Sequence, residues 1–165
     1  MRVFGIAGFK NSGKTTLIVE LIREFVARDV RVATVKHAHH NFDIDVPGKD
    51  SFLHRDAGAS QVIVASAHRW AHINELRGEP EPRLADLLSR IDDVDLVLVE
   101  GYKGGDHPRL ELRRAGRDAP ELAADDAGIR AIVADYDIES APVTVLRRDD
   151  VAGIADFILA NAAPI

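Results

Sequence analysis

The chain has 165 residues, a formal net charge of −6 at pH 7 and no cysteine. A chain of this length is most simply one domain, residues 1–165, and it can bury a core without disulfides or a structural metal. The missing cysteines exclude disulfides, thiolate metal sites and cysteine nucleophiles and favour a reducing, cytoplasmic location.

Apolar residues from Val3 to Ala7 predict a strand that leads into GFKNSGKTT, residues 8–16. This segment fits G-x-x-x-x-G-K-[ST], and the apolar positions after it recur at helical spacing to about Ala27. Backbone N–H groups of such a loop converge on one point, where the next helix adds the positive end of its dipole. In a loop of this kind the lysine reaches the β/γ-phosphates and the Thr15 hydroxyl holds Mg²⁺. We therefore predict a phosphate-binding loop that includes Asn11, Ser12, Gly13, Lys14, Thr15 and Thr16.

A buried strand at 32–35 completes a βαβ unit, and the polar segment KHAHHNFDIDVPGKDS, residues 36–51, follows it. Ligands of open α/β sheets bind at the carboxyl ends of strands, so we expect this segment on the side of the phosphate loop. Asp43 and Asp45 are two residues apart, and an extended loop directs both to the same side. Two interpretations stay open: they complete a Mg²⁺ shell or accept a proton from water, or they are solvated loop acids.

The same segment holds His37, His39 and His40, and imidazole suits Zn²⁺ or Ni²⁺. The alternative is that these histidines contact phosphate, a partner subunit or solvent. Lys36, Lys49 and Lys103 are candidate anion contacts in loops at this edge, or solvated surface lysines. Asp50 or Ser51 is expected to cap a helix that runs to Ala57 and ends at Gly58.

Residues 61–65 and 69–73 predict two strands of a hairpin, which we expect to add antiparallel strands to the parallel sheet. A helix follows Pro82, and the apolar strand 95–100 ends in Glu100. A strand that ends in a carboxylate delivers it to the phosphate side of the sheet, and Mg²⁺ prefers such oxygen ligands. Glu100 is therefore expected to bind Mg²⁺, directly or through water, or to orient an attacking water.

Three short strands, at 110–112, 130–134 and 143–146, and a closing helix at 151–159 complete the pattern, with an exposed connection at 114–128. The guanine-reading motif N-K-x-D does not occur in the sequence. Asp135 follows a late strand, and its carboxylate can accept hydrogen bonds from the amine and ring N–H of guanine, or it is only a loop acid. The order of elements predicts a three-layer α/β phosphate-loop NTPase fold, mainly parallel, with an antiparallel hairpin and helices on both faces.

No Lys/Arg-rich block is present, and binding to a nucleic-acid backbone depends on clustered positive charge. No apolar run approaches the ~20 residues that span a bilayer, and the first residues lack the order of a signal peptide. We therefore expect neither nucleic acid nor membrane as a partner.

Three separated motifs resemble the molybdopterin-guanine dinucleotide biosynthesis protein B (MobB) family. They are GFKNSGKTT, then KHAHHNFDIDVPGKDS leading into HRDAGASQVIVAS, and DLVLVEGYK, which together span residues 3–103. The last third of the chain matches only in general layout.

The resemblance implies a homodimeric GTP-binding adapter in molybdenum-cofactor maturation, with weak GTP hydrolysis and GTP and Mg²⁺ as cofactors. It also implies association with the MobA-like nucleotidyltransferase that attaches GMP to molybdopterin, and with molybdoenzyme-maturation proteins. By matching position, the residues Gly13 to Thr16 hold phosphate and Mg²⁺, and other family motifs that face this site include Asp45, Lys49, Ser66 and Glu100.

A second class of function stays open beside the adapter: a metallochaperone-type GTPase that uses the histidines, or a small-molecule kinase. A kinase needs arginines on a lid over the transferred phosphate. Arg113, Arg114 and Arg117 lie in a stretch without a helical lid pattern. A metallochaperone more often uses cysteine ligands, so both features favour the adapter.

Overall fold

The structure, a computed structural model, describes residues 1–38, 42–102, 105–116 and 120–165. The chain divides into two compact units: Met1–His37 with Leu84–Ile165, and Ala38–Arg83. Each unit is described by itself, and the single-domain prediction stays a prediction. The contacts expected of His39, His40 and Lys103 lie outside the described residues.

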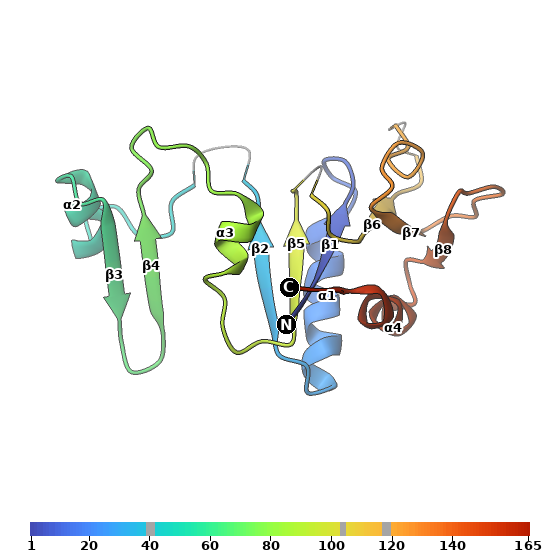
Figure 1. Ribbon diagram of the computed structural model, residues 1–165, viewed down its shortest axis with the longest axis horizontal. Helices are drawn as coiled ribbons and strands as arrows, with labels where there is room; N and C mark the ends of the chain where they lie inside the picture. Colours follow the sequence, from blue (N-terminus) through green and yellow to red (C-terminus); the bar gives the residue numbers. More distant parts are fainter. Residues whose placement is uncertain (39–41, 103–104, 117–119) are drawn as a thin grey trace. The chain divides into compact units, whose positions relative to one another are not determined.

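The larger unit is built on a mostly parallel sheet (Figure 1). Its described strands lie in the order β2, β5, β1, β6, β7 and β8, and β9 pairs antiparallel with β1. The strands are β1 (Arg2–Ala7), β2 (Val32–Lys36), β5 (Leu96–Glu100), β6 (Arg109–Arg113), β7 (Ile129–Ala134), β8 (Thr144–Arg147) and β9 (Ala163–Pro164). The helices of this unit are α1 (Lys14–Ala27), α3 (Leu84–Leu88) and α4 (Val151–Asn161).

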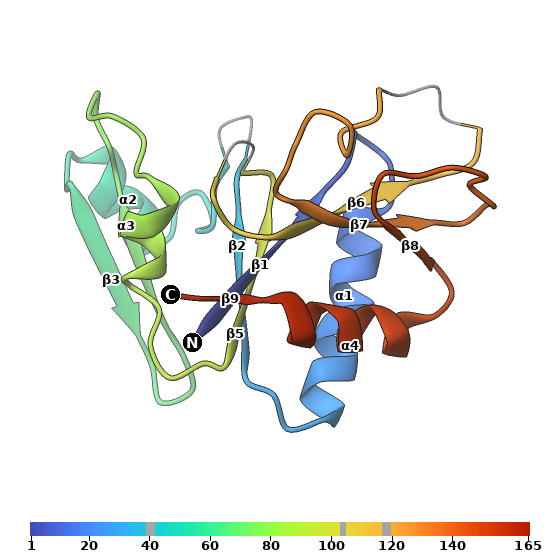
Figure 2. The same cartoon turned by 45° about the vertical axis from the view of Figure 1, so that its right-hand side comes forward.

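Helices α1 and α4 lie side by side and cover one face of this sheet (Figure 2). Alternate residues of a strand point to opposite faces. Phe4 and Ile6 of β1 therefore pack in the core shared with α1 and α4, while Val3 packs on the other face. There α3 covers the β5 side, and residues from the 122–143 region cover β7. The predicted three-layer α/β arrangement is confirmed.

Three details of the sequence prediction were wrong. The hairpin does not extend the parallel sheet but forms a two-stranded sheet of its own. The connection 114–128 is not fully exposed, because Ala123 is buried and Leu122 packs beside it. The N-cap of the helix at 50–56 is Lys49, and neither Asp50 nor Ser51 caps it.

The smaller unit consists of α2 (Asp50–Asp56), β3 (Gln61–Ala65), β4 (Trp70–Asn74) and their connections. An isolated two-stranded sheet is only marginally stable in water, so this unit needs further contacts. Several large apolar side chains are exposed, among them Ile63, Val64 and Trp70 of the hairpin. Among the described residues, no helix is long and apolar enough to cross a membrane.

Candidate functional site

The loop between β1 and α1 has the backbone of an anion cradle. Gly8 (φ 144°), Asn11 (φ 63°) and Gly13 (φ 93°) all have positive φ, which turns successive backbone N–H groups inward. A side chain at Gly8 would place its Cβ 2.7 Å from the Leu112 carbonyl oxygen on β6, so the loop reaches this position only with glycine. Gly13 is the N-cap of α1, and no side chain caps this described helix end. The first N–H groups of α1 are therefore available to an anion.

Lys14 lies across the loop. Its Nζ donates to the carbonyl oxygens of Gly8 at 2.9 Å and Phe9 at 2.8 Å. These two hydrogen bonds hold the ammonium group over the loop. A phosphate group that binds in the loop would meet this ammonium group. Thr15 and Thr16 follow in the first turn of α1 and are exposed, so their hydroxyl groups are accessible to a ligand. The loop that we predicted from the motif thus has the backbone and the cation of a phosphate site.

Glu100 lies at the carboxyl end of β5, as predicted. In the sheet register it is opposite Ile6 on one side and Lys36 on the other. Alternation places Glu100 on the same face as Leu98, which is the face that packs against α1. Its Oε2 lies 3.9 Å from Lys36 Nζ, and its side chain is 14 % exposed. A carboxylate thus stands one strand away from the phosphate loop, on the helix α1 side.

The residues that follow β2 and β5 pack against each other at the carboxyl ends of these strands. His37 donates its backbone N–H to the Glu100 carbonyl oxygen at 2.9 Å. The His37 ring lies 5.1 Å from the Tyr102 ring, between centroids. Gly101 has φ 91°, and a Cβ there would lie 3.2 Å from the His37 carbonyl oxygen. The histidine is therefore packed at the end of the sheet, and its predicted ligand role remains open.

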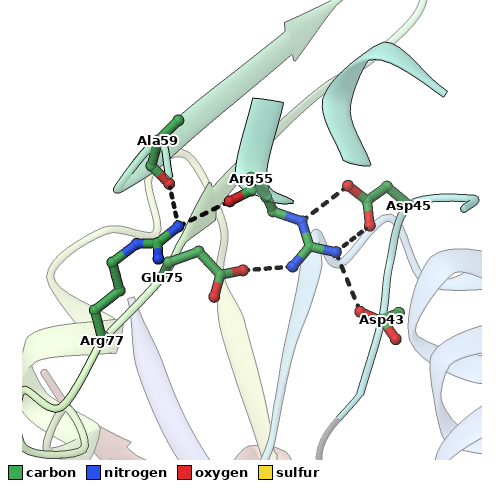
Figure 3. A network of polar contacts seen from close by, with 6 residues as sticks. All are labelled: Asp43, Asp45, Arg55, Ala59, Glu75 and Arg77. Carbon is green, nitrogen blue, oxygen red and sulfur yellow. Dashed lines mark hydrogen bonds and ion pairs between the residues drawn. The ribbon is translucent and has the colours of Figure 1, made fainter. Parts of the chain in front are cut away.

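In the smaller unit, Arg55 contacts Asp43 and Asp45, the two acidic side chains for which we predicted a role at a metal (Figure 3). Its guanidinium group donates to both carboxylate oxygens of Asp45, at 2.9 and 2.6 Å, and to Asp43 at 3.1 Å. It also donates to Glu75 at 2.5 Å, and Arg77 donates to the Arg55 carbonyl oxygen at 2.8 Å. Asp43 and Asp45 do point to one side, as the spacing predicted, but the group that they meet is an arginine.

The Arg55 network is largely shielded from solvent. The side chains of Arg55 and Asp45 are 15 % and 6 % exposed. The hydrogen bonds from Arg55 hold the pKa of the Asp45 carboxyl below its usual range, against the opposing effect of burial. Asp45 is therefore a stable carboxylate with both oxygens engaged, so a role as base or Mg²⁺ ligand requires it to leave Arg55.

Two other predicted contacts have structural roles in the smaller unit. The Ser66 hydroxyl closes the hairpin turn by accepting from the backbone N–H of Arg69 at 3.2 Å and donating to the Arg69 carbonyl oxygen at 3.1 Å. Lys49 is exposed at the N-cap of α2, and its backbone N–H donates to Val46 at 3.1 Å. Their roles toward a nucleotide stay predictions.

Asp135 follows β7 in the larger unit and connects two loops. Its Oδ1 accepts from the backbone N–H of Ala115 at 2.7 Å, and its Oδ2 lies 4.0 Å from Arg114 Nε. The side chain is exposed. Each carboxylate oxygen can accept more than one hydrogen bond, so contact with a base remains compatible with this geometry.

The donor set fits a phosphate-bound Mg²⁺ better than a metal held by protein alone. Among the described residues, no three His, Asp or Glu side chains come together to hold a metal ion. Mg²⁺ in phosphate sites commonly uses one or two carboxylates with phosphate oxygens and water. Glu100, on the α1 side of the sheet, supplies such a carboxylate, and the Thr15 hydroxyl supplies a further oxygen ligand.

Comparison with known proteins places this loop and sheet in a family. The model of molybdopterin guanine dinucleotide synthesis protein B matches residues 3–135. The chain belongs to the MobB family.

Individual MobB relatives align with almost the whole chain. The Escherichia coli protein, a "Molybdopterin-guanine dinucleotide biosynthesis adapter protein", is 41 % identical over 160 residues, which are 95 % of this chain and 91 % of the relative. A Haemophilus influenzae protein of the same name is 42 % identical over 159 residues, 94 % and 86 % of the two chains. The crystal structure of a MobB homologue from Bacillus stearothermophilus aligns with a TM-score of 0.72 at 29 % identity, over 97 % of each chain. The predicted phosphate-loop NTPase fold and family are therefore confirmed, and the last third of the chain, matched only in layout, belongs to the same alignment.

Two polar groups with structural importance were not identified from the sequence of this MobB-family chain. Arg55 lies in α2, where the sequence predicts a helix but indicates no partner for this side chain. Glu111 was placed in a short strand without a role, yet it is 1 % exposed. Its carboxylate accepts from the backbone N–H groups of Leu122 and Ala123, at 3.0 and 2.9 Å, and from Arg113 at 2.9 Å. The alternation of apolar and charged residues in β6 was the available signal, and it suggests a solvent face.

Replacing Arg55 by alanine is expected to raise the pKa of the Asp45 carboxyl toward its ordinary value. The folded pKa is lowered, so the Asp45–Arg55 pair stabilises the protein above the unfolded pKa of about 3.9 and stops doing so as the pH falls through the folded value. Carbon-detected NMR titration of Asp45 in the two proteins measures this. Arg69→Ala, an exposed arginine of the same unit, is the control. An unchanged Asp45 titration in the Arg55 variant contradicts the network.

Proposed function

We propose that this chain is a cytoplasmic GTP-binding adapter of molybdopterin guanine dinucleotide synthesis, with weak intrinsic GTP hydrolysis. In this proposal it assists the MobA-like nucleotidyltransferase that attaches GMP to molybdopterin. The observation that carries it is the phosphate loop of a MobB-family chain. There Lys14 lies over an inward-turned backbone, and the N-terminus of α1 has no side-chain cap among the described residues.

The residues of the larger unit have defined roles in this proposal. The backbone of residues 11–13 and the first N–H groups of α1 bind the phosphates, and Lys14 exchanges its carbonyl partners for β/γ-phosphate oxygens. Thr15 and Glu100 would hold Mg²⁺, which neutralises phosphate charge when bound. Asp135, beyond β7, is our candidate for contact with the guanine base.

The candidate catalytic carboxylates support holding a nucleotide more than consuming it. Both carboxylate oxygens of Asp45 already accept hydrogen bonds from Arg55. Glu100 is paired with Lys36 at 3.9 Å. A residue that activates or orients water must have an oxygen within hydrogen-bond reach of that water. We therefore infer slow hydrolysis without a partner protein.

The alternatives find less support. In the described residues between β6 and β7 there is no helix, so Arg113 and Arg114 do not belong to a helical lid of the kind that a kinase closes over phosphate. Arg117 lies outside the described residues. A metallochaperone more often uses cysteine ligands, and the sequence has no cysteine; two of the three histidines that this alternative needs, His39 and His40, lie outside the described residues. Stoichiometric Zn²⁺ or Ni²⁺ that survives dialysis would revive that alternative.

A titration of GTP against ATP, each with Mg²⁺, tests the proposal. We expect GTP to bind more tightly and its steady-state turnover to lie far below the ~10 s⁻¹ typical of enzymes. The measurement is calorimetry followed by phosphate release in the absence and presence of a molybdopterin-carrying guanylyltransferase. Tighter binding of ATP, or ordinary enzymatic turnover by the chain alone, contradicts it.

A homodimer is part of the same proposal. The hairpin β3–β4 exposes Ile63, Val64 and Trp70, with 66 %, 47 % and 69 % of each residue accessible. A two-stranded sheet with apolar side chains and free edges is a surface that a second copy of the chain can cover. Sedimentation of the wild type and of Trp70→Glu decides it: a monomeric wild type contradicts the dimer.

A further inference from the structure

Arg109, the first residue of β6, is a buried arginine to which the proposed function gives no role. Its side chain is 5 % exposed. Leu110 and Leu112 of β6 pack in the core shared with α1 and α4, so alternation places Arg109 on the opposite face of the sheet. A buried guanidinium group loses its hydration, and it is stable only where its charge and its N–H donors are compensated. The partners of Arg109 therefore show what this charge holds in place.

The side chain of Arg109 joins the loop after β5 to the turn before β7. Nη1 donates to the Tyr102 carbonyl oxygen at 3.3 Å, and Nη2 donates to the Gly105 carbonyl oxygen. On the other side, Nε lies 3.4 Å from Asp126 Oδ2. The guanidinium group packs so closely on Gly128 that a Cβ there would lie 2.5 Å from Nη2. One buried cation thus connects two segments that are far apart in the sequence.

Arg113, on the same face of β6, has the usual partners of a buried arginine. Its guanidinium group donates to Glu111 at 2.9 Å and lies 3.0 Å from a carboxylate oxygen of Glu121. Arg109 differs from it. Among the described residues, both hydrogen bonds from the Arg109 side chain go to carbonyl oxygens of the loop after β5, and Nε, beside Asp126, makes no hydrogen bond. Hydrogen bonds from a charged donor are stronger than those between neutral groups. Arg109 is therefore placed to hold this loop rather than to neutralise an acid.

The loop that Arg109 holds follows directly on Glu100, the last residue of β5 and our candidate Mg²⁺ ligand. Gly101 has φ 91°, a conformation that glycine adopts without strain. Backbone beyond a strand end opens more readily than backbone within the sheet. Tyr102 is restrained at two points, because its ring lies on the ring of His37 and its carbonyl oxygen accepts from Arg109. These contacts fix the chain that leaves Glu100.

We propose that Arg109 is a positioning residue for Glu100. By holding the loop at Tyr102 and Gly105, it keeps the Glu100 carboxylate directed toward the Mg²⁺ of a nucleotide in the phosphate loop. It acts through the backbone, from the opposite face of the sheet. Groups that orient a metal ligand in this way change metal affinity roughly 10–100-fold. The inference rests on the proposed function for the nucleotide and its Mg²⁺, and it adds a residue from outside that site.

The test measures how much Mg²⁺ strengthens GTP binding, as the ratio of the GTP affinity with Mg²⁺ to the affinity in EDTA, both by calorimetry on the full chain. Arg109→Lys keeps the positive charge, but a single ammonium group does not reproduce the planar fork of donors. We expect the ratio to fall about tenfold in this variant, while the affinity in EDTA stays within about twofold of the wild type. An unchanged ratio overturns the proposal, and so does an equal loss with and without Mg²⁺.

A double-mutant cycle with Glu100→Gln shows whether Arg109 acts through Glu100. Glu100→Gln is expected to lower the ratio by itself, because the amide carries no charge for Mg²⁺. The double variant should then lose no more than the larger of the two single losses, and additive losses overturn the proposal. Ile132→Val is the control for lost stability, because its buried side chain packs in the cluster around Ala123. A fall in the ratio as large in this control as in Arg109→Lys also overturns the proposal.

Amide hydrogen exchange tests the positioning without a nucleotide. Peptides that contain Tyr102 and Gly105 should exchange faster in Arg109→Lys and in Asp126→Asn than in the wild type, and Ile132→Val should leave their exchange unchanged. Asp126→Asn keeps the arginine but removes the charge beside it, so it replaces Arg109→Lys in both experiments if that variant does not fold. Unchanged exchange overturns the positioning role. If GTP does not bind the wild type, the proposed function fails, and hydrogen exchange still decides whether Arg109 holds the loop after Glu100.

Discussion

Replacing Lys14 by alanine is expected to weaken GTP binding by at least about 100-fold, because charge-assisted hydrogen bonds to phosphate contribute roughly 1.5–3 kcal/mol each. In the structure the Lys14 ammonium group bridges the carbonyl oxygens of Gly8 and Phe9, within the loop whose backbone turns inward at Gly13. The lysine is the cation of the loop that reaches the β/γ-phosphates. Calorimetric titration with GTP and Mg²⁺ measures the loss.

The Lys14 variant needs a control for folding and for net charge. Arg23 lies in α1, is exposed and carries the same charge, so Arg23→Ala should bind GTP within about twofold of the wild type. Far-UV circular dichroism establishes that both variants retain the helices. Unchanged GTP affinity in the Lys14 variant removes the phosphate-loop assignment.

Local patterns explain why so much of the fold was predictable. The strand, glycine loop and helix of residues 2–27 form one continuous unit, and its periodicity and motif are both contained in the sequence. The position of Glu100 could also be predicted, because a buried apolar strand that ends in an acid has its carboxylate at a known edge of the sheet.

Contacts between residues that are far apart in the sequence could not be predicted. The hairpin at 61–74 shows strand periodicity, but periodicity does not say with which strand an edge pairs, and here the hairpin pairs only with itself among the described strands. Arg55 meets Asp45 and Glu75, which lie ten positions before it and twenty after it, so no local spacing indicates the network. The short strand β9 was missed because two residues, one of them proline, carry no pattern.

Glu111 shows how a correct local pattern leads to a wrong environment. The run RLELR alternates apolar and charged residues, which favours a strand with one face in water. In the structure β6 lies between β1 and β7, and the segment around Ala123 covers the charged face. A parallel strand inside such a sheet is buried on both faces. The carboxylate is therefore enclosed and compensated by three donors.

Replacing Glu111 by leucine is expected to destabilise the protein by about 3–5 kcal/mol, the range for removing one partner of a buried ion pair. The change leaves the backbone N–H groups of Leu122 and Ala123 without their acceptor. It also leaves Arg113 with the exposed Glu121 as its remaining acidic partner among the described residues. Urea unfolding followed by circular dichroism measures the free energy of unfolding.

The double variant Glu111→Leu with Arg113→Leu distinguishes the charge from the packing. Because it removes the uncompensated guanidinium as well, it should be more stable than Glu111→Leu alone. Asp149→Ala serves as the surface control, since Asp149 and its partner Arg147 have side chains 73 % and 71 % exposed, and its cost should stay below about 1 kcal/mol. If Glu111→Leu costs no more than the surface change, Glu111 does not hold β6 to the segment around Ala123. If the double variant is the less stable of the two, shape rather than charge sets the cost, and the buried pair is not what stabilises this part of the sheet.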